Sequence, residues 1–172
     1  MDFIRTPKPD DCIFCSKPAD TRDEENLVLF RGRTCFVLMN LYPYSNGHLM
    51  VATYRHVASL EDLTAEEQGD LMALTTLCAK SLRATMHPDG LNCGLNLGRA
   101  GGAGIDDHLH MHVVPRWIGD VNFMSTISSS KVIVQHLRET YRELLPVFAA
   151  QGRPPAPEPG ATPADLGAGS QE

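Results

Sequence analysis

Residues 107–117 read Asp-His-Leu-His-Met-His-Val-Val-Pro-Arg-Trp, with a histidine at every second position of the first half. Successive side chains of an extended strand point to opposite faces of a sheet. One face is therefore expected to carry His108, His110 and His112, and the other Leu109, Met111 and Val113. The apolar face would pack into a core while the imidazoles face a cleft. Pro115 has no N–H to donate, which favours a strand end at that point.

Two further motifs accompany this strand. Seven residues separate Asn40 from His48, which ends a Gly-His pair, and Cys12-Ile13-Phe14-Cys15 lies near the N-terminus. Together with these motifs the strand resembles the signature of the histidine triad (HIT) superfamily, His-x-His-x-His followed by two apolar residues. The resemblance spans about residues 12–124. The stretch after Trp117 resembles the extension of bacterial members similar to diadenosine polyphosphate hydrolases and phosphorylases, although Trp117 also fits a surface or dimer-packing aromatic.

Alternate histidines alone fit two other interpretations. One is a metal-binding strand, as in zinc enzymes with three histidine ligands. The other is a solvated strand face without chemistry.

Length, charge and cysteine content limit the classes to which the protein can belong. The chain has 172 residues, which predicts one domain, and a net charge of −6 without a run of lysines or arginines. These features predict neither a nucleic-acid surface nor a membrane segment, and residues 1–11 lack the apolar core of a signal peptide. Five cysteines, three of them expected to be buried (Cys35, Cys78 and Cys93), fit a reducing cytoplasm.

The Cys12-x-x-Cys15 motif is typical of a metal or redox site in such a compartment. Two thiolates at this spacing can bind one zinc ion, which needs two further ligands. The resemblance implies that these are His56, eight residues after His48, and His108. A reduced, metal-free pair and a thioredoxin-like redox motif are the alternatives, but the second lacks its usual βαβ surroundings.

The predicted fold class is α+β: a HIT-like fold with an antiparallel sheet, one long helix after the third strand and a C-terminal helix. Strands are expected at 26–30, 34–39, 48–54 and 91–97, with residues 17–26 as a loop. Thr64-Ala-Glu-Glu67 has the capping-box pattern, and the apolar stripe behind it runs to a turn at residues 87–90. Residues 133–148 repeat apolar side chains at helical spacing. In the strand at 91–97, every second residue from Leu91 to Leu97 is expected to face inward.

The glycine-rich stretch 98–104 directly precedes the histidine strand. Glycines adopt positive φ and let backbone amides approach an anion, so this loop suits phosphate. The resemblance places Gly101, Gly102 and Gly104 at the border of the phosphate site and Asn96 at a phosphate-contacting position. The family's usual Gln or Ser just before the triad is replaced by residues 103–105.

The resemblance also implies the roles of the remaining site residues. His110 would attack the α-phosphate of a nucleotide derivative and form a nucleotidyl-histidine, while His112 and His48 would contact phosphate oxygens or the leaving group. His108 would ligate zinc or contact phosphate, and the cysteines favour zinc. Asn40 would hold the ribose hydroxyls, with a turn-capping side chain as the alternative, and the alternative for His48 is a buried histidine satisfied by a carbonyl.

The implied function is a nucleotidyl hydrolase or transferase that acts on dinucleoside polyphosphates, as a homodimer with a structural zinc ion. A nucleoside phosphoramidase, a three-histidine metal hydrolase and a non-catalytic nucleotide-binding adaptor are the alternatives. The HIT domain is expected to span residues 1–150. Residues 151–172 are rich in Pro, Gly and Ala and are expected to form a disordered tail, because they bury too little apolar surface to offset ordering entropy.

Overall fold

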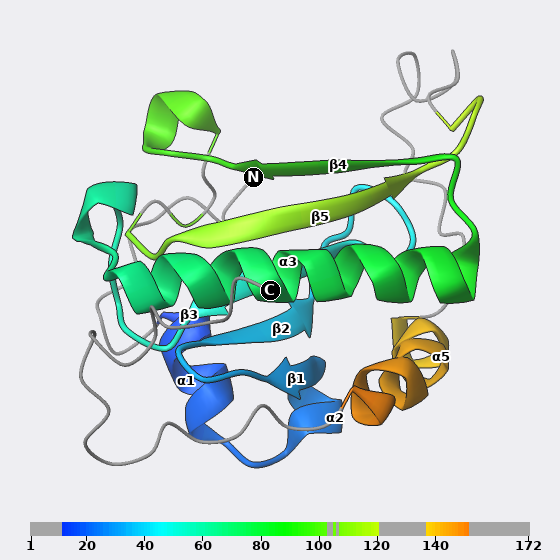
Figure 1. Ribbon diagram of the computed structural model, residues 1–172, viewed down its shortest axis with the longest axis horizontal. Helices are drawn as coiled ribbons and strands as arrows, with labels where there is room; N and C mark the ends of the chain where they lie inside the picture. The colour runs from blue at the N-terminus through cyan, green and yellow to red at the C-terminus, as the bar shows by residue number, and fades with distance from the viewer. Residues whose placement is uncertain (1–11, 103–104, 106, 121–136, 152–172) are drawn as a thin grey trace, which may run out of the picture.

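The computed structural model describes residues 12–102, 105, 107–120 and 137–151 (Figure 1). Five antiparallel strands form one sheet in the order β1-β2-β3-β5-β4. The strands are β1 (Val28–Arg31), β2 (Cys35–Met39), β3 (Leu49–Thr53), β4 (Gly90–Leu95) and β5 (His110–Arg116). The helices are α1 (Ile13–Ala19), α2 (Asp23–Asn26), α3 (Ala65–Met86) and α5 (Leu137–Ala150), with 3-10 turns η2 (Leu60–Asp62) and η3 (Arg99–Gly101). The predicted α+β architecture is confirmed.

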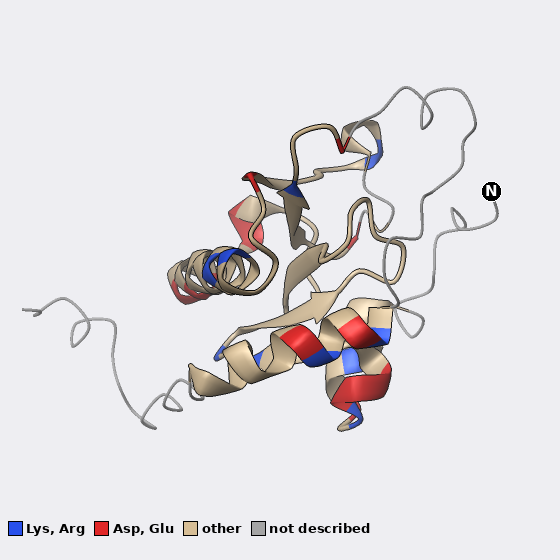
Figure 2. Cartoon of the chain, turned by 90° about the vertical axis from the view of Figure 1, so that its right-hand side faces the viewer, with Lys and Arg blue, Asp and Glu red and all other residues tan. Residues whose placement is uncertain are grey.

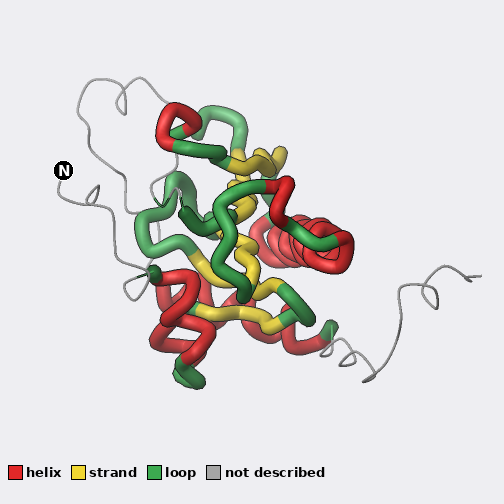
Figure 3. The backbone as a smooth tube through the Cα atoms, turned by 90° about the vertical axis from the view of Figure 1, so that its left-hand side faces the viewer, coloured by secondary structure: helices red, strands yellow, loops and turns green. Residues whose placement is uncertain are grey.

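The sheet separates two apolar clusters, and strand alternation decides which residue joins which cluster. On one face, α3 and α5 pack against a large core that includes Leu109, Met111 and Val113, as predicted. On the other face, a smaller cluster joins α1 to the sheet; it contains Cys12, Phe14, Val28, Phe36, Leu38, Met50 and Ala52. Helices accordingly lie on both sides of the strands in Figure 3. Strand β3 is buried at all five positions, which confirms the expectation from its unbroken apolarity.

Helix α3 begins and ends where its sequence predicts. The side chain of Thr64 accepts from the backbone N–H of Glu67 at 3.2 Å, and Glu67 Oε2 accepts from the N–H of Thr64 at 2.8 Å, which completes the capping box. The helix ends at His87, whose φ of 48° is left-handed. Its predicted apolar stripe is buried throughout: Leu71, Leu74, Cys78 and Leu82.

The link between β2 and β3 is held in a closed turn. The N–H of Asn40 donates to the carbonyl of His48 at 3.0 Å, so the two ends of the link meet. Gly47 has a φ of +78°, and a Cβ there would lie 2.5 Å from the sulfur of Met86. Glycine is therefore required at this position both for its backbone conformation and for the close approach of α3.

Several boundaries differ from the sequence-based expectations. Residues 17–26 are not a plain loop, because α1 and α2 form there around Arg31. That side chain donates to the carbonyls of Pro18 and Asp20 and pairs with Asp23 at 2.6 Å. Strand β5 continues one residue past Pro115.

The expected inward face of the fourth strand is only partly buried. Leu91 and Leu95 pack against the large core, but Cys93 is exposed and Leu97, beyond the strand's end, is 47% exposed. The reason is that, among the described strands, β4 lies at the edge of the sheet and pairs with β5 alone. The other two cysteines expected to be buried, Cys35 and Cys78, are buried.

Charged positions lie mainly on the helices, where acidic and basic residues stand side by side in Figure 2. Within the described ranges, none of the helices combines the length and the apolar character that crossing a bilayer requires. The position Ile133 and residues 152–172 lie outside the described residues, so the division into a domain at 1–150 and a tail at 151–172 stays a prediction.

Replacing Thr64 by Ala should lower the free energy of unfolding by about 1 kcal/mol, because the capping box loses its hydroxyl acceptor. Thr76→Ala is the matched control: its exposed hydroxyl bonds only the carbonyl of Met72 within α3. Urea denaturation of both variants measures the difference. Equal loss in the two would mean that the cap contributes nothing beyond helix propensity.

Candidate functional site

Strands β3 and β5 bring four histidines together on the face of the sheet opposite α3. The register pairs Met50 with His112 and Ala52 with His110, while His48 directly precedes β3 and His108 lies just before β5. His48 and His108 are fully buried and His110 is 7% exposed. The structure therefore gathers all four predicted histidines, but it buries three of them more deeply than an open cleft would.

His110 has one ring nitrogen engaged and one available. Its Nδ1 lies 2.8 Å from the carbonyl oxygen of His108, and because a carbonyl can only accept, Nδ1 carries the proton. Within the described residues Nε2 has no hydrogen-bond partner, so its lone pair is free. Burial lowers the pKa of His110, an effect that its bond to the His108 carbonyl partly opposes. A neutral imidazole with a free Nε2 lone pair is a nucleophile.

His48 and His112 form a chain of hydrogen bonds with a fixed direction. The backbone N–H of Tyr44 donates to Nδ1 of His48 at 3.2 Å, so the proton of His48 sits on Nε2. That nitrogen lies 2.9 Å from Nδ1 of His112 and donates to it. His112 then carries its own proton on Nε2, and this N–H can be offered to a ligand oxygen.

The same surroundings keep both rings neutral. Burial, followed by the neighbouring His112 and His110, lowers the pKa of His48 to about 3. Burial and then His110 lower the pKa of His112 to about 4.

Asn40 lies at the start of this chain of hydrogen bonds. Its Nδ2 donates to Nδ1 of His48 at 3.3 Å, and its Oδ1 accepts from the N–H of Tyr42 at 2.9 Å. Both ends of the amide are thus used within the link, in agreement with the turn-capping alternative. A contact of Asn40 with ribose stays a prediction.

A second group of side chains lies beside His110. Cys12, Cys15, His56 and His108 direct one ligand atom each toward a common point, and these atoms lie within 4.8 Å of one another. Nδ1 of His108 lies 3.3 Å from Sγ of Cys12 and 3.2 Å from Nδ1 of His56. Nδ1 of His56 in turn lies 3.3 Å from Sγ of Cys15. A tetrahedral zinc with bonds of about 2.0–2.3 Å requires ligand separations of roughly 3.3–3.8 Å. The four predicted residues therefore fit one such ion.

The two histidines of the cluster also have a neighbour on the ring nitrogen that faces away from the cysteines. Nε2 of His108 donates to the carbonyl of Thr53 at 2.9 Å, which leaves Nδ1 unprotonated and turned to the cysteines. Nε2 of His56 faces a carboxylate oxygen of Asp107 at 3.9 Å. Such outer partners are typical of metal-ligating histidines. Both nitrogens of His108 are engaged in this way, and Nδ1 faces the cysteines.

The Cys15 thiol is not held as a thiolate by the protein itself. Burial raises the pKa of Cys15 to about 11, with added contributions from Cys12 and Asp107. A bound cation is the group that would stabilise the deprotonated pair.

A cavity of about 420 Å³ opens over β4 and β5 beside His112. Its lining is Tyr44, Asn92, Cys93, Gly94, Leu95, Asn96, His112, Val114 and Arg116. Asn96 and His112, both predicted to contact nucleotide, thus share one cavity, and Nδ2 of Asn96 also donates to the carbonyl of Gly102 at 3.4 Å. Gly98 and Gly102 have positive φ, as predicted for this loop, whereas Gly104 lies outside the described residues.

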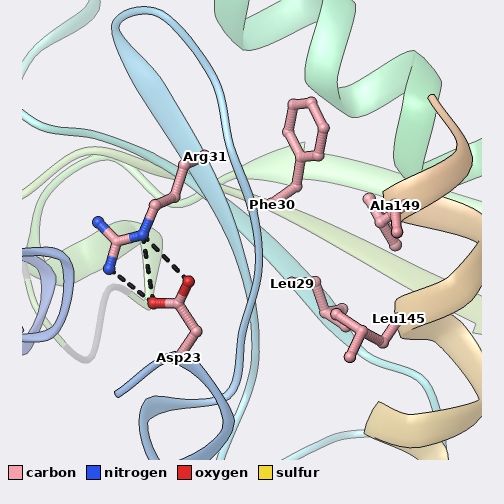
Figure 4. A pocket seen from close by; sticks show the side chains of 7 residues that line it. Asp23, Leu29, Phe30, Arg31, Leu145 and Ala149 are labelled. Carbon is pink, nitrogen blue, oxygen red and sulfur yellow. Dashed lines mark hydrogen bonds and ion pairs between the residues drawn. The ribbon is translucent and has the colours of Figure 1, made fainter. Parts of the chain in front are cut away.

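A smaller cavity of about 240 Å³ lies between β1 and α5 (Figure 4). Leu29, Phe30 and Leu145 line it together with the Arg31–Asp23 ion pair. Neither histidine nor cysteine borders it, and the ion pair already serves to hold α2.

Sequence reasoning missed two aromatic residues of the site. The ring of Phe14 stacks on His110 with centroids 4.6 Å apart, and Tyr44 lies 4.9 Å from the ring of His48. Phe14 stands between the two cysteines and Tyr44 in the link before His48, so only their proximity to the motifs could have drawn attention to them.

Comparisons with known proteins agree with this geometry. A sequence model described as HIT domain matches residues 21–117. The chain is similar to a Mycobacterium tuberculosis protein named AP-4-A phosphorylase, with 50% identity over 129 residues, which are 75% of this chain and 66% of that relative. It is also similar to a bis(5'-adenosyl)-triphosphatase of Dictyostelium discoideum, with 30% identity over 89 residues, 52% of this chain and 59% of that relative. The match spans less than two thirds of the length of each of these relatives.

Among solved structures, the chain is similar to a zinc-bound histidine triad family protein from Mycobacterium smegmatis. The TM-score is 0.65 at 25% sequence identity, and the match covers 83% of this chain and 96% of that one.

The neutral state of buried His48 should make the fold sensitive to acid. Its folded pKa of about 3 lies below the ordinary 6.5, so the unfolded chain binds the extra proton and stability falls as pH drops below about 6.5. Between pH 7 and pH 5 the wild type should lose roughly 2 kcal/mol more stability than His48→Gln.

Denaturant titrations of both proteins at the two pH values measure this difference in slope. His87→Gln, which replaces an exposed histidine at the end of α3, is the control. A His48→Gln slope equal to that of the wild type would contradict a neutral His48.

Proposed function

Since the chain belongs to the HIT domain family, we propose that it is a nucleotidyl hydrolase or transferase that cleaves the α-phosphate linkage of dinucleoside polyphosphates. The family resemblance drawn from the histidine strand is thereby confirmed. The observation that carries the proposed activity is His110, whose Nδ1 donates to the carbonyl of His108 while Nε2 remains free. The names of the two relatives point to diadenosine tri- and tetraphosphates as the substrate class.

The proposed reaction proceeds in two displacements at one phosphorus atom. Nε2 of His110 attacks the α-phosphorus, a P–N bond forms, and the P–O bond to the rest of the substrate breaks. The positive charge that develops on the imidazole is stabilised by the bond from Nδ1–H to the His108 carbonyl. An acceptor then attacks the same phosphorus, the P–N bond breaks, and the nucleotide leaves.

The remaining groups of the site handle the negative charge on phosphate. His112 would donate its Nε2–H to a phosphate oxygen, with His48 behind it holding that tautomer. Asn96 lines the cavity beside His112, and the Gly101–Gly102 turn is next to it. Donors fixed before the substrate arrives are the arrangement that stabilises developing charge most effectively.

The identity of the acceptor distinguishes a hydrolase from a phosphorylase. Water would give hydrolysis and inorganic phosphate would give phosphorolysis, with the same histidine intermediate. The 50% identity to a protein named AP-4-A phosphorylase favours inorganic phosphate.

Zinc is the metal that the Cys12, Cys15, His56 and His108 set fits. Four protein ligands fill a tetrahedral ion and leave no position for substrate, so it would stabilise the fold and take no part in phosphoryl transfer.

A homodimer in the cytoplasm completes the proposal. Within the part of the chain that the structure describes, β4 has a strand partner on one side, so its outer edge offers backbone groups to a second copy. The five cysteines are all free, which fits a reducing compartment. Light scattering on the purified chain tests the dimer.

His110→Gln should reduce turnover of diadenosine tetraphosphate to below a few per cent, since the amide has no lone pair able to replace Nε2. Assays with and without inorganic phosphate separate the acceptors, and chemical quenching of the wild type should trap an acid-labile nucleotidyl adduct that His110→Gln lacks. Thermal denaturation checks that the variant is folded. Binding of AMP without any turnover by the wild type would favour a nucleotide-binding adaptor, and cleavage confined to P–N substrates would favour a phosphoramidase.

The purified protein should contain about one zinc per chain. The double change Cys12→Ser and Cys15→Ser should remove it and lower the melting temperature, because structural zinc contributes directly to folding. Cys93→Ser, at the exposed edge strand, is the control and should keep the metal. Full zinc content in the double variant, measured by atomic emission, would rule out the site.

A further inference from the structure

The four-residue cluster and the reactive histidine touch each other through one aromatic ring. Phe14 lies between the two cysteines of the Cys12-x-x-Cys15 motif and is 1% exposed. Its ring stacks on His110 with centroids 4.6 Å apart and planes inclined by 29°. The same ring lies 5.3 Å from that of His108. One phenyl group therefore packs against both a residue of the cluster and the histidine proposed to attack phosphorus.

We propose that Phe14 is a positioning residue for His110, and that the flanking cysteines hold Phe14 in place for this purpose. The inference rests on the proposed function for the role it gives to His110. The Cys12–Cys15 segment would then do more than bind metal. It would also hold the flat, apolar ring of Phe14 against His110 and so set the plane of the reactive imidazole.

The hydrogen bond of His110 does not by itself set the plane of its ring. The bond from Nδ1 to the His108 carbonyl restricts the ring, but a hydrogen bond tolerates a broad range of angles, so the ring keeps some freedom to turn about its Cβ–Cγ bond. Stacking at 29° fixes the ring plane and hence the direction of the Nε2 lone pair. Attack on phosphorus requires aligned orbitals, and a displacement of about 1 Å can cost on the order of 100-fold in rate.

Phe36 provides an internal comparison. It belongs to the same apolar cluster as Phe14 and is fully buried, but its ring stacks on Tyr54 at 5.4 Å and not on a histidine. Loss of either phenyl group should cost similar packing energy. Only loss of Phe14 should disturb His110.

The experiment compares Phe14→Leu with Phe36→Leu in the full-length, zinc-loaded protein. The first readout is NMR of the histidine rings, which needs no substrate: the ring-current shift of the His110 protons should disappear in Phe14→Leu and persist in Phe36→Leu. Zinc content should equal that of the wild type in both. With diadenosine tetraphosphate, kcat should fall about ten-fold or more in Phe14→Leu with KM nearly unchanged, and should stay near the wild-type value in Phe36→Leu.

Each other outcome overturns the proposal. An unchanged His110 signal, an equal fall of kcat in both variants, or loss of zinc from Phe14→Leu would mean that the phenyl ring only fills the core or supports the cluster. Phe14→Met, which keeps more of the volume, replaces the leucine variant if that chain does not fold. A wild type without turnover would contradict the proposed function alone, because the NMR readout still decides whether Phe14 orients His110.

Discussion

The hydrogen bond from Nδ1 of His110 to the carbonyl of His108 is the contact on which the rest of the site depends. Through this bond His108 contributes to both parts of the site. Its ring belongs to the cysteine cluster, and its backbone carbonyl orients the ring of His110. The His108 ring is in turn fixed by the carbonyl of Thr53 at the end of β3. The chemistry is thus supported by main-chain groups of two paired central strands, which are more rigid than side chains on loops.

Burial gives the histidines their common electrostatic character. It is the largest cause of the lowered pKa at His48, His110 and His112, so the rings are neutral at neutral pH. Neutral rings can act as directed donors and acceptors, which is what the chain from Tyr44 through His48 to His112 requires. The desolvation is imposed by the apolar cluster around Phe14 on one face, while the large core behind β5 offsets its cost in stability.

Much of this arrangement follows from local patterns in the sequence. The capping box at Thr64 and the period of two in β5 are short-range features, and each predicted its element correctly. The four residues that the Cys-x-x-Cys motif and the family resemblance named as metal ligands lie together in one cluster. The exposure of Cys93 and the short helices around Arg31 were not predictable in this way, because they depend on strand order and on tertiary hydrogen bonds. The rings of Phe14 and Tyr44 were missed for the same reason: the histidines that they contact are brought to them by the folded sheet and by the turn before β3.

The alternation along β5 also limits how this chain can change length. Leu109, Met111 and Val113 fill the large core while the histidines between them form the site. Adding or deleting a single residue would exchange the two faces, placing imidazoles under α3 and aliphatic groups beside the cysteines. A single substitution changes one side chain on one face, whereas an insertion or deletion of one residue reverses the facing of every residue that follows it in the strand. Over evolutionary time β5 should therefore tolerate replacement while rejecting insertion, whereas the turns that flank the sheet are free to vary in length.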